Sequence, residues 1–146
     1  MITHKPPPIV IVEDSDEDFD TVQQAIQKAN IAAEVRRATT GGGCLELLRG
    51  VAAVHPALVL MDLNTPGTDG REALAAIKAD PSLKIYPVVV FSTSSNPKDL
   101  TFCYEAGANA YHVKPVRYLD HLQIVIEILT YWLGRVTLPD PLGKLQ

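Results

Sequence analysis

The chain has 146 residues, of which 47% are hydrophobic and 21% are charged. This is about one domain's length with ordinary globular composition, so intrinsic disorder is excluded and a single core is expected. The 13 basic and 17 acidic side chains give a net charge of −4, and because no basic stripe is present, nucleic acid is not an expected partner.

Short apolar runs alternate with longer helical stretches along the chain. Four of the five runs are rich in Val, Ile, Leu or aromatics without polar alternation, which is typical of strands buried on both faces of a parallel sheet. With right-handed crossovers, this order predicts an α/β protein with the doubly wound, flavodoxin-like (βα)5 fold and a five-stranded parallel sheet. The predicted strands are 9–12, 33–38, 57–61, 88–91 and 110–113, and the predicted helices are 19–29, 42–54, 70–79, 97–106 and 118–133.

The fourth helix has the clearest ends. Asn96 followed by Pro97 is an N-cap and first-turn pair, and Gly107 is a helix stop. These local signals predict both of its boundaries.

No internal repeat or linker divides the chain. We expect an N-terminal tail over residues 1–7, one domain over 8–133 and a C-terminal extension over 134–146.

Polar residues end four of the five predicted strands. Glu13 and Asp14 follow the first strand and Asp62 the third, while Ser92 follows the fourth and Lys114 the fifth. In a doubly wound sheet, ligands bind beyond the carboxyl ends of the strands, where the strand order reverses. These five side chains are therefore expected to meet at one end of the sheet.

Three carboxylates a few ångströms apart repel one another, and a hard divalent cation with oxygen ligands is the usual remedy. Mg²⁺ is the predicted ion, because it is satisfied by one or two carboxylates, a backbone carbonyl and phosphate oxygens. An Asp can attack phosphorus and form an acyl phosphate while the metal and a lysine neutralise the oxygens. Lys114 suits that second task.

Four segments, VEDSDED, LMDLNTPGTDG, PVVVFSTSS and GANAYHVKPV, together resemble the ordered motifs of receiver domains of two-component signalling. The match covers about residues 8–133. The resemblance implies that Asp62 is the phosphoacceptor and that Lys114 contacts the phosphoryl group. It also implies that four groups hold Mg²⁺: Glu13, Asp14, Asp62 and the backbone carbonyl of Asn64.

The same resemblance implies a switch. In receivers a hydroxyl moves toward the phosphate and an aromatic side chain of the fifth strand turns inward; here these would be Ser92 and Tyr111. A plain strand aromatic remains the alternative for Tyr111. The resemblance further implies a cis peptide between Lys114 and Pro115.

A narrower resemblance is to the small single-domain response regulators that partner cyanobacterial phytochromes. It rests on VEDSDED, VVVFSTSS and the tail YWLGRVTLPDP. It implies phosphoryl transfer from the histidine kinase module of a light sensor, a tendency to form homodimers, and no output domain. Such a protein is a signalling phosphoprotein and not an enzyme, since it catalyses only its own phosphorylation and dephosphorylation.

Two other classes of protein remain open. A haloacid dehalogenase-type hydrolase also uses an aspartyl phosphate with Mg²⁺, but it needs Asp-x-Asp, and this chain has Asn64 where the second acid would act. A flavodoxin-like flavin binder would need a hydroxyl-rich first loop, where Glu13 and Asp14 would instead repel a phosphate.

Other acids have simpler interpretations. Asp16, Glu17 and Asp18 are interpreted as charges that favour a helix N-terminus, and Asp69 as a turn residue before Gly70.

The cellular compartment follows from what the sequence lacks. Cys44 and Cys103 both fall in predicted helices, so a disulfide is not expected. No apolar run approaches the length of a membrane span, and the N-terminus lacks the apolar core of a signal peptide. We expect a cytoplasmic protein without a membrane partner.

The last helix predicts self-association. A second apolar stripe, Ile124, Ile128 and Tyr131, lies beside the core stripe, and two-fold symmetry would pack two copies of it together. The alternative is that the tail VTLPDP covers this stripe. The expected core stripe is Leu119, Leu122, Val125, Ile126, Leu129, Trp132 and Leu133.

Overall fold

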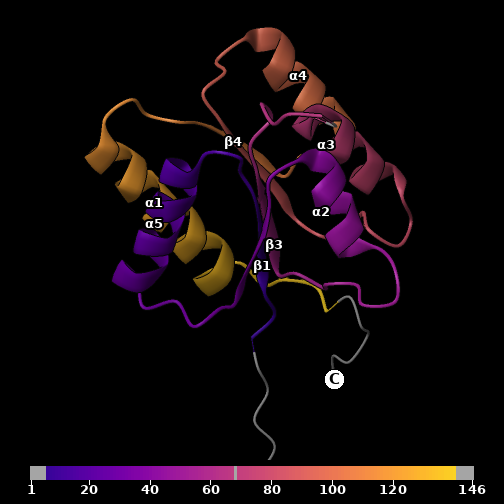
Figure 1. Cartoon of the computed structure of the whole chain (residues 1–146), viewed down its shortest axis with the longest axis horizontal. Coiled ribbons are helices and arrows are strands. Elements are labelled where there is room, and N and C mark those ends of the chain that lie inside the picture. Colours follow the sequence, from indigo (N-terminus) through magenta and orange to yellow (C-terminus); the bar gives the residue numbers. More distant parts are fainter. Residues whose placement is uncertain (1–5, 68, 141–146) are drawn as a thin grey trace, which may run out of the picture.

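The structure, a computed structural model, describes residues 6–67 and 69–140 (Figure 1). Five strands alternate with five helices in the order expected from the sequence. The elements are β1 (Ile9–Val12), α1 (Asp16–Lys28), β2 (Val35–Ala38), α2 (Gly41–Leu48), β3 (Leu58–Met61), α3 (Gly70–Ala79), β4 (Val88–Ser92), α4 (Pro97–Ala106), β5 (Ala110–Val113) and α5 (Tyr118–Gly134).

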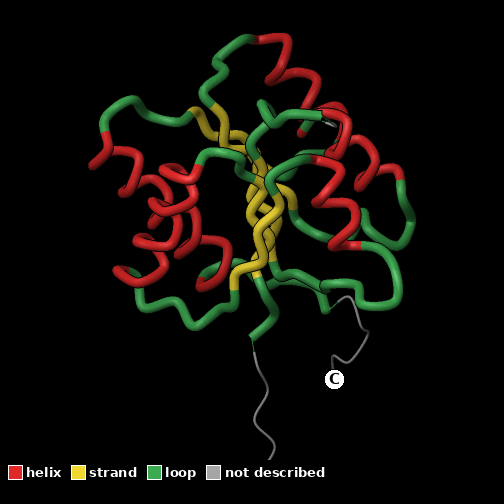
Figure 2. Tube along the Cα trace, in the orientation of Figure 1, coloured by secondary structure: helices red, strands yellow, loops and turns green. Residues whose placement is uncertain are grey.

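All five strands are parallel, in the order β2-β1-β3-β4-β5. Figures 1 and 2 show the twisted sheet between two layers of helices, with α1 and α5 on one face and α2, α3 and α4 on the other. The predicted doubly wound α/β fold is confirmed, and its strand order reverses between β1 and β3. In the described part of the chain, no helix is long and apolar enough to cross a membrane.

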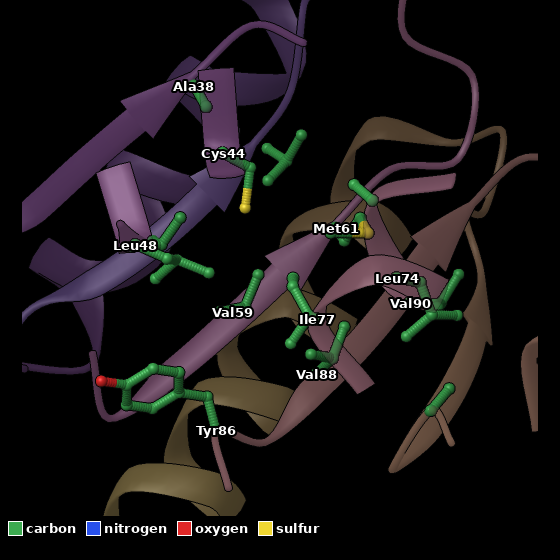
Figure 3. Packing of buried hydrophobic residues seen from close by; sticks show 14 of the residues in the cluster. Ala38, Cys44, Leu48, Val59, Met61, Leu74, Ile77, Tyr86, Val88 and Val90 are labelled. Atoms are coloured by element: carbon green, nitrogen blue, oxygen red, sulfur yellow. The ribbon is translucent and has the colours of Figure 1, made fainter. Parts of the chain in front are cut away.

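The strands are buried on both faces because alternate side chains pack into two separate cores. Val59, Met61, Val88 and Val90 point toward α2 and α3, as Figure 3 shows. Their neighbours in sequence point to α1 and α5 and form the second core. A fully buried aliphatic side chain stabilises the fold by about 1.5–3 kcal/mol, so both helical layers are firmly held to the sheet.

Two predicted helix boundaries are wrong. The first helix begins at Asp16 and not at residue 19, because the Ser15 side chain caps it by accepting the backbone N–H of Asp18 at 3.2 Å. The second helix ends at Leu48, six residues early. Gly50 has φ +91°, a left-handed conformation that takes the chain out of the helical path toward β3.

The buried face of α5 also differs from the prediction. Leu119, expected in the core, is 73% exposed, whereas Ile128, assigned to the outer stripe, is only 3% exposed. The buried face centres near Val125. At about 100° per residue, Leu119 lies about 120° from Val125 and outside this face, while Ile128 lies about 60° from it and within the face. Tyr131 remains 56% exposed, so the described part of the tail does not cover it.

Candidate functional site

The sheet register brings the first two predicted carboxylates together. Val12 pairs with Met61, so Glu13 and Asp62 leave the sheet side by side at its carboxyl edge. Both are buried, while the neighbouring Asp14 is exposed. One carboxylate oxygen from each of the three residues lies within 4.8 Å of the others. The structure therefore groups all three predicted acids.

Lys114 arrives from the end of β5, where its backbone N–H donates to the carbonyl of Ser92 at 2.7 Å. Its buried Nζ donates to Glu13 Oε1 at 2.6 Å and to Asp62 Oδ2 at 3.0 Å. Burial disfavours the ammonium form, but the attraction of Glu13 and the hydrogen bonds to carboxylates outweigh it and raise the pKa of Lys114. Conversely, burial raises the pKa of Glu13 above its usual range, against the pull of Lys114.

The donor set fits a small divalent cation. Mg²⁺ binds oxygen at about 2.0–2.1 Å, so two of its ligand atoms lie at most about 4.2 Å apart. The mutual limit of 4.8 Å between the carboxylate oxygens of Glu13, Asp14 and Asp62 is close to that distance. A small adjustment of side chains brings all three within reach of one ion, with hard oxygen donors only.

Sequence reasoning missed a third carboxylate partner of Lys114. Asp18 Oδ2 accepts a hydrogen bond from Lys114 Nζ at 2.8 Å. Asp18 does lie in the first turn of α1, as its interpretation as a helix-start charge requires. Because α1 begins three residues earlier than predicted, this turn also lies against the strand ends. The Ser15 cap was the signal that could have revealed it.

Ser92 is fully buried and is linked to Asp62 through Asn64. The backbone N–H of Asn64 donates to Asp62 Oδ1 at 3.1 Å, and its side-chain Nδ2 donates to Ser92 Oγ at 3.3 Å. Ser92 Oγ also accepts the backbone N–H of Ser94 at 3.2 Å. The hydroxyl of Ser92 thus lies near the carboxylate of Asp62, as predicted. It is also bound to the loop that follows β4, through the backbone N–H of Ser94.

Tyr111 contacts the same loop. Its hydroxyl donates to the carbonyl of Ser94 at 2.8 Å, and the Ser94 hydroxyl donates to Asp99 Oδ2 at 2.6 Å. The Arg71 guanidinium joins α3 to α4 by donating to Asp99 at 2.8 Å and to Asp69 at 3.1 Å. These bonds from Arg71 and Ser94 lower the pKa of Asp99 to about 2. No sequence motif indicated this network.

Asp69, the two cysteines and the Lys114–Pro115 peptide bond are also the subject of predictions. Asp69 is the N-cap of α3, which agrees with its interpretation as a turn residue and not a ligand. Cys44 and Cys103 are buried and free, as expected. The cis peptide at Lys114–Pro115 is wrong, because the described chain has only trans bonds; trans is the ordinary preference before proline, by about 0.5–1 kcal/mol.

The chain is similar to known proteins over most of its length. The family model described as the response regulator receiver domain matches residues 9–127. The response regulator Rcp1 of Synechocystis sp. is 38% identical over 141 residues, which are 94% of this chain and 96% of Rcp1.

Solved structures agree as well. The Mn²⁺-bound form of Rcp1 has a TM-score of 0.87 at 39% identity, over 92% of this chain and 100% of that one. The phosphorylated cyanobacterial phytochrome response regulator RcpA has a TM-score of 0.87 at 38% identity, over 92% and 99%. From the family match and these similarities, the chain belongs to the response regulator receiver domain family.

Proposed function

We propose that this chain is a single-domain response regulator that accepts a phosphoryl group on Asp62 from a sensor histidine kinase. The observation that carries the proposal is the grouping at the carboxyl edge of the sheet: Asp62 lies 3.0 Å from the Lys114 ammonium and within 4.8 Å of Glu13 and Asp14. The functional unit is residues 8–133, with a tail over 1–7 and an extension over 134–146.

The residues have distinct tasks in the transfer. A carboxylate oxygen of Asp62 forms a bond to phosphorus as the bond between phosphorus and the donor breaks. Lys114 contacts the phosphoryl oxygens and neutralises part of their charge. Mg²⁺, when bound, supplies further positive charge at the same oxygens. Its ligands are Glu13, Asp14, Asp62 and the backbone carbonyl of Asn64.

The phosphoryl donor is the histidine kinase module of a phytochrome. The support is the similarity to RcpA, which is described as a cyanobacterial phytochrome response regulator, at 38% identity over 92% of this chain. A second such relative, the bacteriophytochrome response regulator AtBRR, is 33% identical with a TM-score of 0.70.

Ser92 and Tyr111 carry the signal away from the site. When Ser92 Oγ turns to the phosphoryl group, it releases the backbone N–H of Ser94 and the side chain of Asn64. The loop after β4 then loses one of its anchors, and the hydrogen bond from Tyr111 to Ser94 is free to break. Tyr111 turns inward into the space that the loop leaves.

Acetyl phosphate with Mg²⁺ tests this function directly. We expect intact-protein mass spectrometry to detect one added phosphoryl group per chain, and none after chelation of Mg²⁺. Continuous phosphate release without an accumulating adduct would instead support the hydrolase, and co-purification of a yellow cofactor would support the flavin binder.

The metal ligands can be tested without phosphorylation. The double variant Glu13→Gln, Asp14→Asn should weaken Mg²⁺ binding by at least about tenfold, because it removes two charged ligands and leaves Asp62 alone. Calorimetric titration measures this. The control Glu17→Gln, Asp20→Asn makes the same chemical change on the exposed face of α1 and should bind Mg²⁺ as the wild type does. Equal affinity in the two double variants would refute the metal site.

A homodimer through α5 is the remaining part of the proposal. Tyr131 is the exposed member of the outer stripe, and it lines an open cavity of about 570 Å³ with Ile124 of α5 and His112 of β5. Tyr131→Glu should weaken association at least about tenfold in sedimentation equilibrium, because it would bury a charge at the two-fold contact.

The control for this experiment is Val51→Glu, at a fully exposed apolar residue in the loop between α2 and β3. Ile128→Glu is unsuitable, because Ile128 lies in the monomer core. A wild type that sediments as a monomer at high concentration, with and without phosphorylation, would rule out the dimer.

A further inference from the structure

Lys114 has more carboxylate partners than the proposed phosphoryl transfer explains. Its Nζ lies 2.6 Å from Glu13, 2.8 Å from Asp18 and 3.0 Å from Asp62. In the proposed function, Asp62 becomes an acyl phosphate and Glu13 turns to the metal. Two of the three anchors of Lys114 are then engaged elsewhere at the moment when its position matters most.

Asp18 is the anchor that stays. It is not in the group of acids within metal-binding reach of one another, which in the described chain contains only Glu13, Asp14 and Asp62. It is also fixed in place, because its backbone N–H donates to the Ser15 cap at 3.2 Å. Its side chain is 32% exposed, so placing this carboxyl group beside Lys114 carries little desolvation cost.

A buried histidine, His121, lines the same small cavity as Asp18. His121, on α5, is 8% exposed, and its ring packs edge-on against Phe91 at 5.1 Å between centroids. Its Nε2 is buried and has no hydrogen-bond partner among the described residues. A small cavity of about 10 Å³ is lined by His121, Asp18, Phe91 and Asp62.

This cavity is about the smallest that accommodates one water molecule, and such a water needs two or more polar partners. His121, whose buried Nε2 has no partner among the described residues, and Asp18 both line the cavity and carry polar atoms that can serve as these partners. Phe91 also lines the cavity, and the centre of its ring lies 5.7 Å from Lys114 Nζ, close enough for a cation–π contact with the ammonium.

We infer that Asp18 is the positioning residue of Lys114, and that His121 holds Asp18 in place through one water molecule in the cavity between them. Asp18 keeps the ammonium at the edge of the site while Glu13 turns to the metal and Asp62 receives the phosphoryl group. The inference rests on the proposed function, because it assigns Asp18 a task in the same transfer.

The first measurement is made on the metal-free protein. A lysine ammonium held by three carboxylates exchanges its protons slowly, so its ¹⁵N-bound protons should give an NMR signal near neutral pH. We expect this Lys114 signal to disappear or shift strongly in Asp18→Asn. It should be unchanged in Asp20→Asn, which removes the same charge from an exposed position on the same helix.

The second measurement is the rate of phosphorylation by acetyl phosphate. Asp18→Asn should lower the rate at saturating donor by about five- to twentyfold, because the neutral amide attracts the ammonium less strongly than the carboxylate does. The half-saturating Mg²⁺ concentration should stay within about threefold. Asp18→Glu should restore at least half of the lost rate. His121→Phe keeps a ring against Phe91 but removes the nitrogen, and should lower the rate about two- to fourfold.

Several results would overturn the inference. One is an unchanged Lys114 signal in Asp18→Asn. Another is a phosphorylation rate of Asp18→Asn equal to that of Asp20→Asn. A phosphorylation rate of Asp18→Asn above that of the wild type would mean that Asp18 only competes with the phosphoryl group for the lysine. A wild-type rate in His121→Phe would remove His121 from the assignment. A wild type that gives the Lys114 signal but accepts no phosphoryl group would contradict the proposed function and not the Asp18 contact.

Discussion

Asp62→Asn is expected to abolish phosphorylation by acetyl phosphate completely while leaving the fold intact. An amide cannot form an acyl phosphate, so no covalent adduct can accumulate at this position. Its shape is nearly that of the carboxylate, and its oxygen can still accept the backbone N–H of Asn64, now 3.1 Å from Asp62 Oδ1.

The variant should fold because Lys114 keeps two other carboxylate partners. The contact that is lost is the one from Lys114 Nζ to Asp62 Oδ2 at 3.0 Å, while the bonds to Glu13 and Asp18 remain. Loss of one hydrogen bond to a charged group is offset by the loss of repulsion between buried carboxylates. We therefore expect the free energy of unfolding to change by no more than about 1–1.5 kcal/mol.

Intact-protein mass spectrometry measures the extent of phosphorylation, and urea unfolding measures the free energy of unfolding. Asp20→Asn, on the exposed face of α1, is the control and should be phosphorylated like the wild type. A stoichiometric adduct on Asp62→Asn would show that the phosphoryl group goes to another residue.

The parts of the fold with strong local signals could be predicted from the sequence. Both ends of α4 agree with the structure, because the Asn96 side chain accepts the backbone N–H of Lys98 at one end and Gly107 adopts φ +110° at the other. The end of α2 differs from the prediction because the prediction extended the helix through Gly50, whose left-handed conformation, φ +91°, ends the helical path after Leu48.

Tertiary packing decides the face of α5. A helix that is apolar over most of its surface does not indicate which arc meets the sheet. For that reason the prediction places Leu119 in the core and Ile128 outside it, the reverse of what the structure shows. The buried arc is set by packing against α1 and the sheet, which share one core with α5.

The candidate site shows the same division. The strand ends could be read directly, because parallel strands bring Glu13, Asp62 and Lys114 to one edge. The contact of Asp18 with Lys114 spans 96 residues, and that of Arg71 with Asp99 spans 28. Such pairs depend on the relative placement of whole helices, so a single sequence carries no local pattern for them.

Gly70→Ala is expected to destabilise the protein and to displace its phosphoacceptor. Gly70 is the first residue of α3, and its N–H donates to the carbonyl of Leu63 at 3.0 Å, so the helix begins in direct contact with the segment after β3. A methyl group at position 70 would lie 2.7 Å from the Cα of Leu63 and would also overlap the carbonyl oxygen of Asp62.

Both of the atoms that the methyl group would meet belong to the backbone, so no side chain can rotate away. Overpacking of this kind costs about 1–3 kcal/mol, and relief requires the loop from Asp62 to Leu63 to move. The carboxylate of Asp62 would then leave its position 3.0 Å from Lys114 Nζ. Urea unfolding should detect the loss of stability, and the phosphorylation rate should fall with it.

The matched control is Gly134→Ala at the last residue of α5, where an added methyl group meets no atom within 4 Å. There the substitution should be neutral or stabilise by up to about 1 kcal/mol, because alanine favours the helix over glycine. Equal stability and equal phosphorylation rates in the two variants would mean that α3 can retreat from the strand end, and that the close packing of Gly70 does not hold Asp62 in place.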